Sequence, residues 1–381
     1  MRRSFLSVVA LFSFLAASPA CWAHGDESPF AFDVSPRIWG LDLGIGYRGL
    51  ALLPGVDTTF WAYAGGGYET MYYYRTAAGG LVQPGDLAAT GALAGQVPAY
   101  KRIEAAWKLG FVQGFAWNER TGTNLVEAFA WYRGRSDWNN FMAHQLISAS
   151  TISDQDGILQ NSLVAGAAYN DVLFAREHKT KSGISGEVSA EWGPGFLLNS
   201  LVGSSDYLRL NATFRGFLPV YDVAPDRPVN LFSVYLGEFL SVDYAVGIGA
   251  AVPLNIRQTF GGTDPRTGLG WAVRGVDTGS LDTNLKAVNN IEVRMNLPAI
   301  VLPDLVPGVV VYWDVGYFVQ AGEAGVADPA PSGLVSSAGI GVYLDLLDIA
   351  TLAFYAHYRL TGTNADGTAL TPFALEFGLH F

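Results

Sequence analysis

The chain ends on the sequence Phe373-Ala374-Leu375-Glu376-Phe377-Gly378-Leu379-His380-Phe381. Large apolar side chains alternate there with small or polar ones, and the last residue is aromatic. This period of two is the period of a β-strand whose two faces meet different surroundings. The stretch therefore predicts a strand with an apolar face and a polar face.

The same alternation recurs along most of the chain, with apolar residues at every second position. The clearest stretches are 102–111, 208–215, 309–317 and 352–360, and further strands are expected near 37–49, 58–75, 124–135, 162–175, 184–193, 229–243, 287–297 and 335–345. Strands that are apolar on the outside and polar on the inside are typical of membrane-spanning β-barrels. The connections near 76–98, 136–158 and 252–285 are rich in Gly, Pro and polar residues, as surface loops are.

We therefore expect an all-β fold, a transmembrane antiparallel β-barrel of about 16 strands, with 12–14 also compatible with the strands read directly. Charged residues make up only 15% of the chain, against about a quarter in soluble domains. The alternative is a soluble β-sandwich with its polar face in water, which the low charge and the aromatic terminus disfavour.

The N-terminus reads as an export signal. Arg2 and Arg3 precede an apolar run, and small residues end it, so we expect a signal peptide at 1–23, a short segment at 24–36 and the barrel at 37–381. The apolar run is shorter than the about 20 residues that a membrane-spanning helix needs. Cys21 is the only cysteine; the alternative that it carries lipid is weakened by Ser18, where that motif prefers leucine. The expected location is the bacterial outer membrane.

Composition also bears on the chemistry. The formal net charge is −11, so no nucleic-acid partner is expected. The five histidines are scattered without metal-ligand spacing, and we expect no metal and no cofactor. No G-x-S-x-G motif occurs and no catalytic residues can be nominated, so the chain is not expected to be an enzyme.

Three motifs follow one another in the C-terminal half. They are Val273-Arg274-Gly275-Val276, Asn290-Ile291-Glu292-Val293-Arg294 and Tyr312-Trp313-Asp314-Val315-Gly316. In order and spacing they resemble the V-R-G-[FY], E-x-R and F-x-D-x-G motifs of the barrel superfamily that contains BamA, TamA and the two-partner secretion transporters, the bacterial surface antigen barrels. Position 276 holds valine where that family has an aromatic residue.

The resemblance is closest over 261–320. Upstream, Tyr169-Asn170-Asp171 and Thr180-Lys181-Ser182-Gly183 are similar to the family's Y-D-x-R-D and P-x-x-G strand pair without its central arginine. The family's periplasmic POTRA domains are not found, as in its short members. The resemblance implies insertion or translocation of proteins, or of lipids, through a seam between the first and last strands. The alternative function is a passive diffusion pore or a surface-structural barrel.

A structural latch is expected inside the barrel. Alternation places Glu292, Arg294, Asp314 and Gly316 on the inner face of neighbouring strands. If the 252–285 loop folds inward, Arg274 can bind both carboxylates, because a guanidinium offers a rigid fork of donors. The expected latch residues are Val273, Arg274, Gly275, Glu292, Tyr312, Asp314 and Gly316. The alternative is that Arg274 is an ordinary exposed loop charge.

The two end strands carry further signals. Gly40, Gly44 and Gly46 are expected to leave the inner face of the first strand almost bare, which weakens packing there; alternatively, glycine is merely common in this chain. Phe377, Leu379 and Phe381 resemble the C-terminal signal by which outer-membrane proteins pair with an assembly machine, although they also suit a plain closing strand. The expected partners are outer-membrane lipid, that assembly machinery, and a periplasmic partner or client outer-membrane proteins.

Overall fold

The computed structural model of the protein is one antiparallel sheet whose strands follow each other in chain order. The structure describes residues 29–37, 40–50, 52–72, 99–140, 157–175, 177–226, 230–250, 252–257, 273–276, 283–300, 305–320, 332–346, 350–362 and 368–379. The expected signal at 1–23 lies outside these residues. In the described part of the chain, no helix is long and apolar enough to cross a membrane.

The described residues form these elements: β1 (Phe30–Arg37), β2 (Gly40–Tyr47), β3 (Thr58–Tyr72), β4 (Ala99–Asn118), β5 (Thr123–Asn140), β6 (Ile158–Asn170), β7 (Leu173–Ala175), β8 (Thr180–Gly193), β9 (Tyr207–Asp222), β10 (Ser233–Gly247), α3 (Leu254–Arg257), β11 (Thr283–Asn296), β12 (Leu305–Gln320), β13 (Ser332–Leu346), β14 (Ala350–Arg359) and β15 (Leu370–Leu379). The all-β prediction is confirmed. Against the expected 16 strands, the described residues hold a sheet of 15.

Strand β7 is a continuation of β6 rather than a separate position in the sheet. Both strands pair with β8, and Asn170 opposite Ser185 and Leu173 opposite Ser182 belong to one register. The break between them lies opposite Gly183, whose φ is +101°. A side chain at Gly183 would meet the carbonyl oxygen of Asp171 at 2.0 Å, so glycine is required there.

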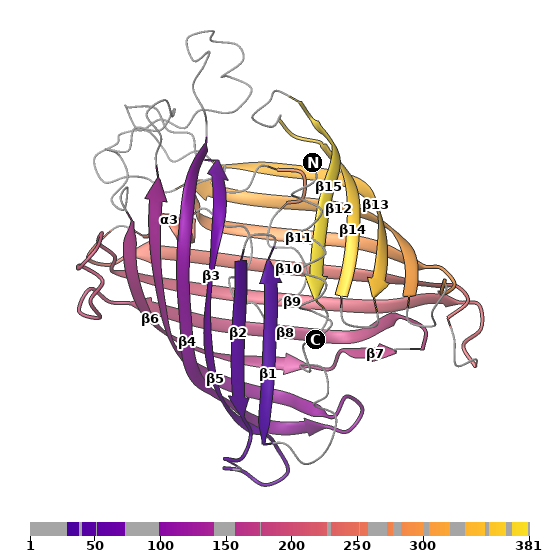
Figure 1. The fold of residues 1–381 in the computed structure, drawn as a ribbon, viewed down its shortest axis with the longest axis horizontal. Helices are drawn as coiled ribbons and strands as arrows, with labels where there is room; N and C mark the ends of the chain where they lie inside the picture. The colour runs from indigo at the N-terminus through magenta and orange to yellow at the C-terminus, as the bar shows by residue number, and fades with distance from the viewer. Residues whose placement is uncertain are drawn as a thin grey trace, which may run out of the picture.

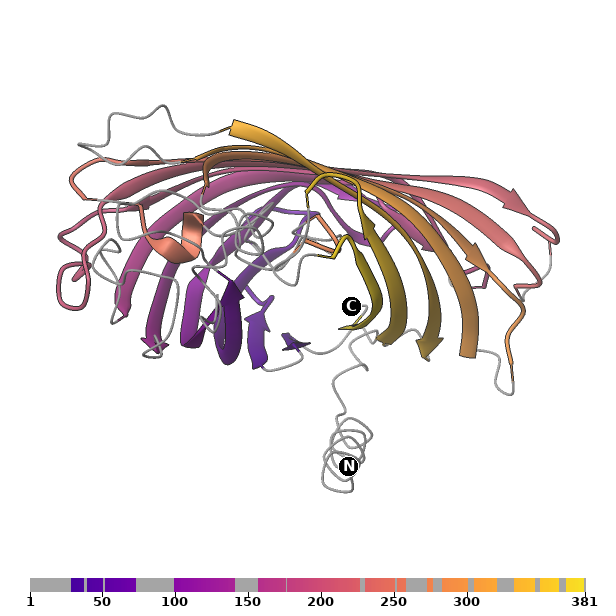
Figure 2. The same cartoon turned by 90° about the horizontal axis from the view of Figure 1, so that it is seen from above.

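The sheet curves round and brings its first and last strands toward each other (Figures 1 and 2). Strands β1 and β15 lie in contact. In the described part of the chain, however, no hydrogen-bonded ladder joins them, and the ladder runs from β1 through the sheet to β15. The hydrogen-bonded ladder of the described residues is therefore interrupted between the first and last strands.

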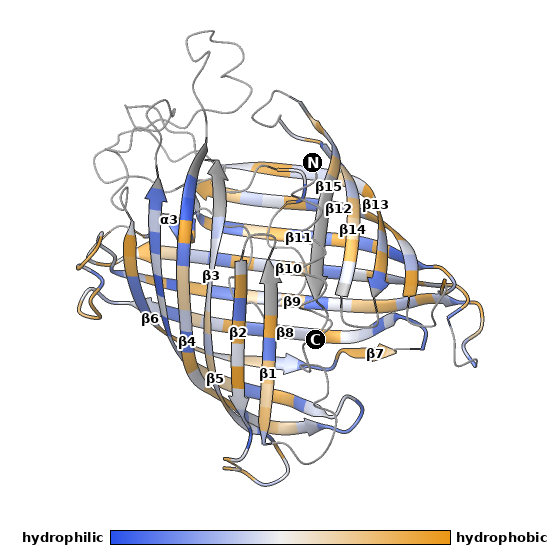
Figure 3. Ribbon diagram, viewed as in Figure 1, coloured by the Kyte–Doolittle hydropathy of each residue, from blue (hydrophilic) through white to orange (hydrophobic). Residues whose placement is uncertain are grey.

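The two faces of the sheet differ as the sequence predicts, and hydropathy alternates along the strands (Figure 3). In β4, the apolar Ile103, Leu109 and Phe111 are exposed on the outer face, whereas Arg102 and Glu104 are buried on the inner face. Charged groups on the inner face of so many strands require partners there, because an unpaired buried charge is costly. These partners form the candidate site described below.

The connections distinguish the two ends of the sheet. Connections at one end are short, such as 119–122 and 347–349, and those at the other are long, such as 73–98 and 248–282. In bacterial barrels the short turns face the periplasm and the long loops face outward. We call these the short-connection end and the long-connection end.

Glycine recurs directly opposite aromatic residues in neighbouring strands. Examples are Gly44 with Tyr63, Gly46 with Trp61, Gly110 with Trp131, Gly166 with Phe129, Gly193 with Tyr207, Gly308 with Tyr343, Gly339 with Tyr312 and Gly341 with Tyr355. In each pair, a Cβ on the glycine would lie within 3 Å of the ring. The ring covers the glycine backbone and replaces the packing that the missing side chain would supply.

Two expectations about the first strands are wrong. The sheet begins one strand earlier than predicted, at Phe30, because β1 alternates correctly despite Pro36; proline lacks a backbone N–H but is tolerated at a sheet edge. The inner face of β2 is also not bare, since the rings of Trp61 and Tyr63 cover Gly46 and Gly44. Gly40, which lies opposite Gly67, has no such partner in register.

Candidate functional site

The candidate site is built on the tip of the connection between β10 and β11, residues Val273–Val276. Val273 is fully buried, and it packs against Phe318 and Val335 on the inner face of β12 and β13. The backbone turns at Gly275, whose φ is +77°. A side chain at Gly275 would place its Cβ 2.6 Å from the Cβ of His357. Only glycine satisfies both the turn and the close approach.

Arg274 points from this tip onto two carboxylates of the sheet. Its Nε and Nη2 donate to the two oxygens of Asp314 at 2.9 and 2.8 Å, and its Nη1 donates to Glu292 at 3.0 Å. The backbone N–H of Arg274 also donates to Asp314 at 2.9 Å. Paired donors on one carboxylate fix the orientation of the guanidinium as well as its position.

The carboxylates are themselves fixed by the sheet. Glu292 lies on β11 and Asp314 on β12, and both are buried. Glu292 also accepts a hydrogen bond from Nε of Arg294 at 2.7 Å, so two arginines balance two acids. Burial alone lowers the pKa of Arg274, but the hydrogen bonds and charge of Asp314, together with Glu292, raise it above its ordinary value. The guanidinium therefore stays charged.

Aromatic rings form a platform beneath the guanidinium. The carbon at its centre lies 3.7 Å from the centroid of the Tyr312 ring, a favourable cation–π distance. The Tyr312 hydroxyl forms a hydrogen bond with Nδ1 of His357. The Tyr355 ring stacks on the same imidazole. The Tyr312 and Tyr355 rings lie flat because their partners Gly339 and Gly341 leave room for them.

The predicted latch residues thus lie at one place. Arg274 contacts Glu292, Tyr312 and Asp314 directly, while Val273 and Gly275 shape the tip. Gly316 is buried on β12 between Asp314 and Phe318, two residues that contact the tip, so a side chain there would stand between them. In β15, Leu379 pairs with Ala350 and Phe377 with Leu352. Phe381 lies outside the described residues.

A second part of the same connection also docks inside the sheet, and the sequence did not predict it. Ile256 of α3 packs against Tyr207 and Ala245 on the inner face of β9 and β10. Nζ of Lys286 donates to the carbonyl of Ile256 at 2.7 Å and pairs with Asp243 at 3.1 Å. The connection is therefore attached to the inner face at both α3 and its tip (Figure 2).

Behind α3 lies a second buried ionic cluster. Arg209 donates to both oxygens of Asp243, at 2.6 and 2.8 Å. Glu191 accepts from Tyr207 at 2.8 Å and pairs with Arg133 at 3.3 Å. Their alternation onto inner-face positions was visible in the sequence, but which partners meet across strands depends on register, which the sequence alone leaves open.

The inner face of β11 links the Val273–Val276 tip to the short-connection end. Glu292, Arg294 and Asn296 occupy alternate positions there. Asn296 accepts from the Tyr343 hydroxyl at 2.5 Å and donates to the carbonyl of Lys179 at 2.8 Å. Lys179 belongs to the turn between β7 and β8. One strand thus holds the loop tip at Glu292 and this turn at Asn296, four residues further along.

No metal site is evident in this arrangement. Within the described ranges, no group of three or more His, Cys, Asp or Glu side chains has the geometry to hold a metal ion. The chemistry that the site offers is ionic and hydrogen-bonded attachment of a loop to a wall.

Comparison with known proteins identifies the fold. The sequence matches no protein-family model and no curated protein. The structure aligns with BamA from Haemophilus ducreyi lacking POTRA domains 1–3 at a TM-score of 0.52 and 14% identity, over 91% of this chain and 64% of that one. The fold is that of a BamA-like outer-membrane barrel. With the apolar outer face, this agrees with the expected location in the bacterial outer membrane.

CdiB from Acinetobacter baumannii and CdiB from Escherichia coli also match, at TM-scores of 0.47 and 0.48 and identities of 13% and 12%. The alignments cover 89% and 93% of this chain, and 50% and 63% of those chains. The chain therefore spans less than two thirds of the length of the BamA and CdiB structures.

Proposed function

We propose that the chain is a BamA-like outer-membrane barrel that takes part in inserting or translocating proteins at the outer membrane. It acts through a seam between β1 and β15, and the Val273–Val276 tip is held inside the sheet as a latch. The proposal assigns no bond-making chemistry to the chain. The observation that carries it is the interruption of the ladder between β1 and β15 in the described residues.

The seam lies between short strands. β1 and β2 have 8 residues each and β15 has 10, whereas β4 has 20. Separating two strands costs the hydrogen bonds and packing between them, so it costs least where no ladder is formed. A client strand can pair with either edge by strand addition.

The latch braces the wall that leads to the seam. Arg274 connects the loop tip to β11 and β12, and Gly275 rests against His357 of β14, the neighbour of β15. In the proposed mechanism, this contact keeps the C-terminal wall in shape while the edge of β15 is free to exchange partners.

A passive pore is the competing function. The two attachments of the connection, at α3 and at the tip, place backbone inside the sheet, which favours a plugged interior over an open channel. Planar-bilayer recordings separate these functions. A plugged insertase is expected to be closed most of the time, whereas steady solute-sized openings would support the pore.

The decisive test is depletion of the protein followed by a survey of outer-membrane composition. Loss of particular outer-membrane proteins, restored by the wild-type chain, is expected. Variants in which a disulfide locks the seam extend the test. Each carries a cysteine at position 32 of β1 and a second cysteine at one of the outward positions of β15. The matched control pairs Phe32 with Ile45, which already face each other across β1 and β2.

Oxidised seam locks are expected to abolish complementation, and the control lock is expected to leave it intact. Unchanged outer-membrane composition after depletion, or full activity of a locked seam, would reject the proposal. Partners are part of the same proposal: a separate periplasmic protein that receives clients, and an assembly machine that reads Phe377, Leu379 and Phe381. Deletion of Phe381 is expected to lower the amount of assembled barrel.

A further inference from the structure

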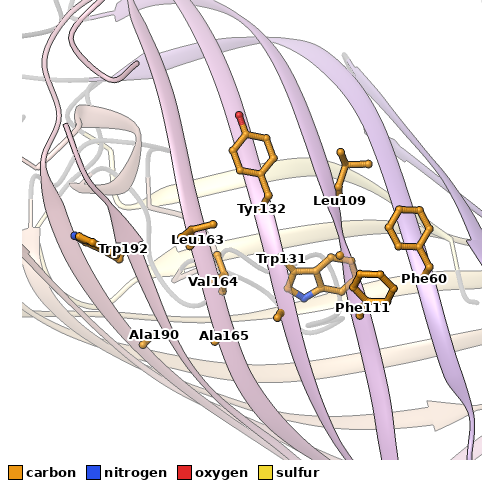
Figure 4. A pocket seen from close by; sticks show the side chains of 12 residues that line it. Phe60, Leu109, Phe111, Trp131, Tyr132, Leu163, Val164, Ala165, Ala190 and Trp192 are labelled. Atoms are coloured by element: carbon orange, nitrogen blue, oxygen red, sulfur yellow. The ribbon is translucent and has the colours of Figure 1, made fainter. Parts of the chain in front are cut away.

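The outer face of the sheet is hollowed over β3, β4, β5, β6 and β8 (Figure 4). The cavity there has a volume of about 610 Å³. Its lining includes Phe60, Leu109, Phe111, Leu163 and Trp192, and no charged side chain contributes to it. Most of these residues stand on the exposed, apolar side of their strands. The hollow is therefore a groove in the face that a membrane barrel turns toward lipid.

The floor of the groove is a row of alanines set by strand register. Ala130 of β5 lies opposite Ala165 of β6, and Ala165 lies opposite Ala190 of β8. The row continues at one end to Phe111, which is paired with Ala130, and then to Phe60. Three adjacent small side chains make the trough, and the Phe60 and Phe111 rings, 5.0 Å apart, close one end of it.

A row of larger side chains forms the wall toward the long-connection end. Leu109, Tyr132, Leu163 and Trp192 are aligned across β4, β5, β6 and β8. The Trp192 ring is backed by Phe196 in an edge-on contact at 5.6 Å. At β8 the groove reaches the long-connection end, since Trp192 is one residue from the end of that strand. At β4 it crosses the middle of the strand, at Leu109.

The Tyr132 hydroxyl of this wall and the two asparagines behind it are hydrogen-bonded within the protein. The Tyr132 hydroxyl donates to Asn161 at 2.7 Å, and the amide of Asn161 donates to the carbonyl of Leu197 at 2.8 Å. Asn199 is fully buried and donates to the carbonyls of Asn161 and Pro194. The groove thus presents almost entirely apolar surface to an occupant, so it suits hydrocarbon and not a lipid headgroup.

We propose that the groove is a binding site for one acyl chain of a membrane lipid. Lipid surrounds this face of a membrane barrel, and an unfilled hollow there loses dispersion contacts on every wall. The volume falls within the about 300–1,000 Å³ of ordinary small-molecule sites. The inference needs only that the sheet lies in a bilayer, and it does not depend on the proposed seam.

The register also argues against a protein strand as the occupant. Residues 109–111, 130–132 and 163–165 are ladder-paired along the groove. Strand addition requires unpaired backbone groups at a sheet edge, and the groove lies in the middle of the sheet.

Native mass spectrometry of the purified mature chain tests the proposal. The protein is incubated in detergent with phosphatidylethanolamine and lipid A together, and the lipids retained after detergent exchange are counted and identified by mass. The wild-type chain is expected to retain a lipid. Ala165→Trp, which fills the trough, is expected to lose it, and Ala190→Leu provides a milder filling should the tryptophan prevent assembly.

The matched control is Ala356→Trp, an outward-facing alanine of β14 away from the groove, which is expected to retain lipid like the wild type. Loss of lipid in the groove variants but not in Ala356→Trp supports the proposal, and the mass shows which lipid supplies the chain. Equal retention in all variants, no retention by the wild type, or a retained polypeptide in place of a lipid would overturn it.

Discussion

The guanidinium of Arg274 donates two parallel hydrogen bonds to the carboxylate of Asp314, and the backbone N–H of Arg274 donates a third. The two residues lie 40 positions apart in the chain. Asp314 belongs to a central strand of the C-terminal wall, and Arg274 belongs to the longest connection. The contact therefore ties a segment outside the ladder to the middle of the sheet. Both side chains are largely buried, so little water competes for the carboxylate.

Removing the arginine is expected to destabilise the barrel strongly. Arg274→Ala leaves Asp314 and Glu292 buried with their charge only partly compensated, and breaking a buried pair in this way costs roughly 3–5 kcal/mol. Thermal unfolding followed by gel mobility of the heated protein measures the loss. The control is Arg120→Ala, because Arg120 pairs with Asp171 at 3.0 Å while 56% exposed, and an exposed pair contributes about 0–1 kcal/mol.

Charge reversal gives a sharper test of the same pair. Arg274→Glu is expected to damage stability more than Arg274→Ala, and adding Asp314→Arg is expected to restore part of the loss because the attraction returns with opposite polarity. Additive effects of the two substitutions would show that the residues do not act as a pair.

The turn at Gly275 is expected to tolerate no side chain. Gly275→Ala combines a left-handed φ of +77° with a contact of 2.6 Å to Cβ of His357, and the backbone penalty alone is about 1–2 kcal/mol. Gly55→Ala is the matched control, since its φ is +74° with open space around it. The difference in unfolding temperature between the two variants isolates the contact with His357. Equal losses would mean that the tip does not press on β14.

The attachment of α3 is expected to depend on Lys286. Lys286→Met removes the hydrogen bond to the carbonyl of Ile256 and leaves Arg209 to hold Asp243. Trypsin cleavage after Arg257, which is buried in the folded protein, is expected to become faster, because cleavage requires local opening. Lys101→Met, on the outer face of β4, serves as control. Unchanged cleavage in Lys286→Met would show that α3 is held by its apolar contacts alone.

The glycine–aromatic pairs are expected to be sensitive to a single methyl group. Gly44→Ala places a Cβ 2.3 Å from the Tyr63 ring, and such overpacking costs about 1–3 kcal/mol. The loss is expected to shrink when Tyr63→Ala is present as well, because the methyl then has room. Denaturant unfolding of the two single variants and the double variant measures the coupling, and an undiminished loss would contradict the steric explanation.

Much of this architecture was predictable because alternation is a local property. Ile103 to Phe111 or Val309 to Tyr317 reveal an outer face by their own spacing, and the order of the motifs around Arg274, Glu292 and Asp314 predicted that they belong together. Proline at position 36 obscured β1, since the rule that proline avoids strands does not hold at an edge.

Contacts that depend on register across strands could not be read in advance. Gly44 has no side chain, so the sequence alone suggests a bare position on the inner face. The structure shows that the Tyr63 ring, directly opposite, covers it. The docking of α3 depends on Lys286 of β11 and Tyr207 of β9, which both contact Ile256. The sequence around residue 256 contains no pattern that predicts these contacts. The alanine floor of the outer groove is likewise visible only when β5, β6 and β8 are aligned.

Rings that lie flat against the wall set the usable width of the interior. Were Tyr312, Tyr355 or Trp61 opposite ordinary side chains, they would stand upright and crowd the space that the loop tip and α3 enter. Because each ring lies over an opposing glycine, it adds only the thickness of one ring to the inner face. In a curved sheet, this leaves room for α3 and the Val273–Val276 tip to pack against the inner face.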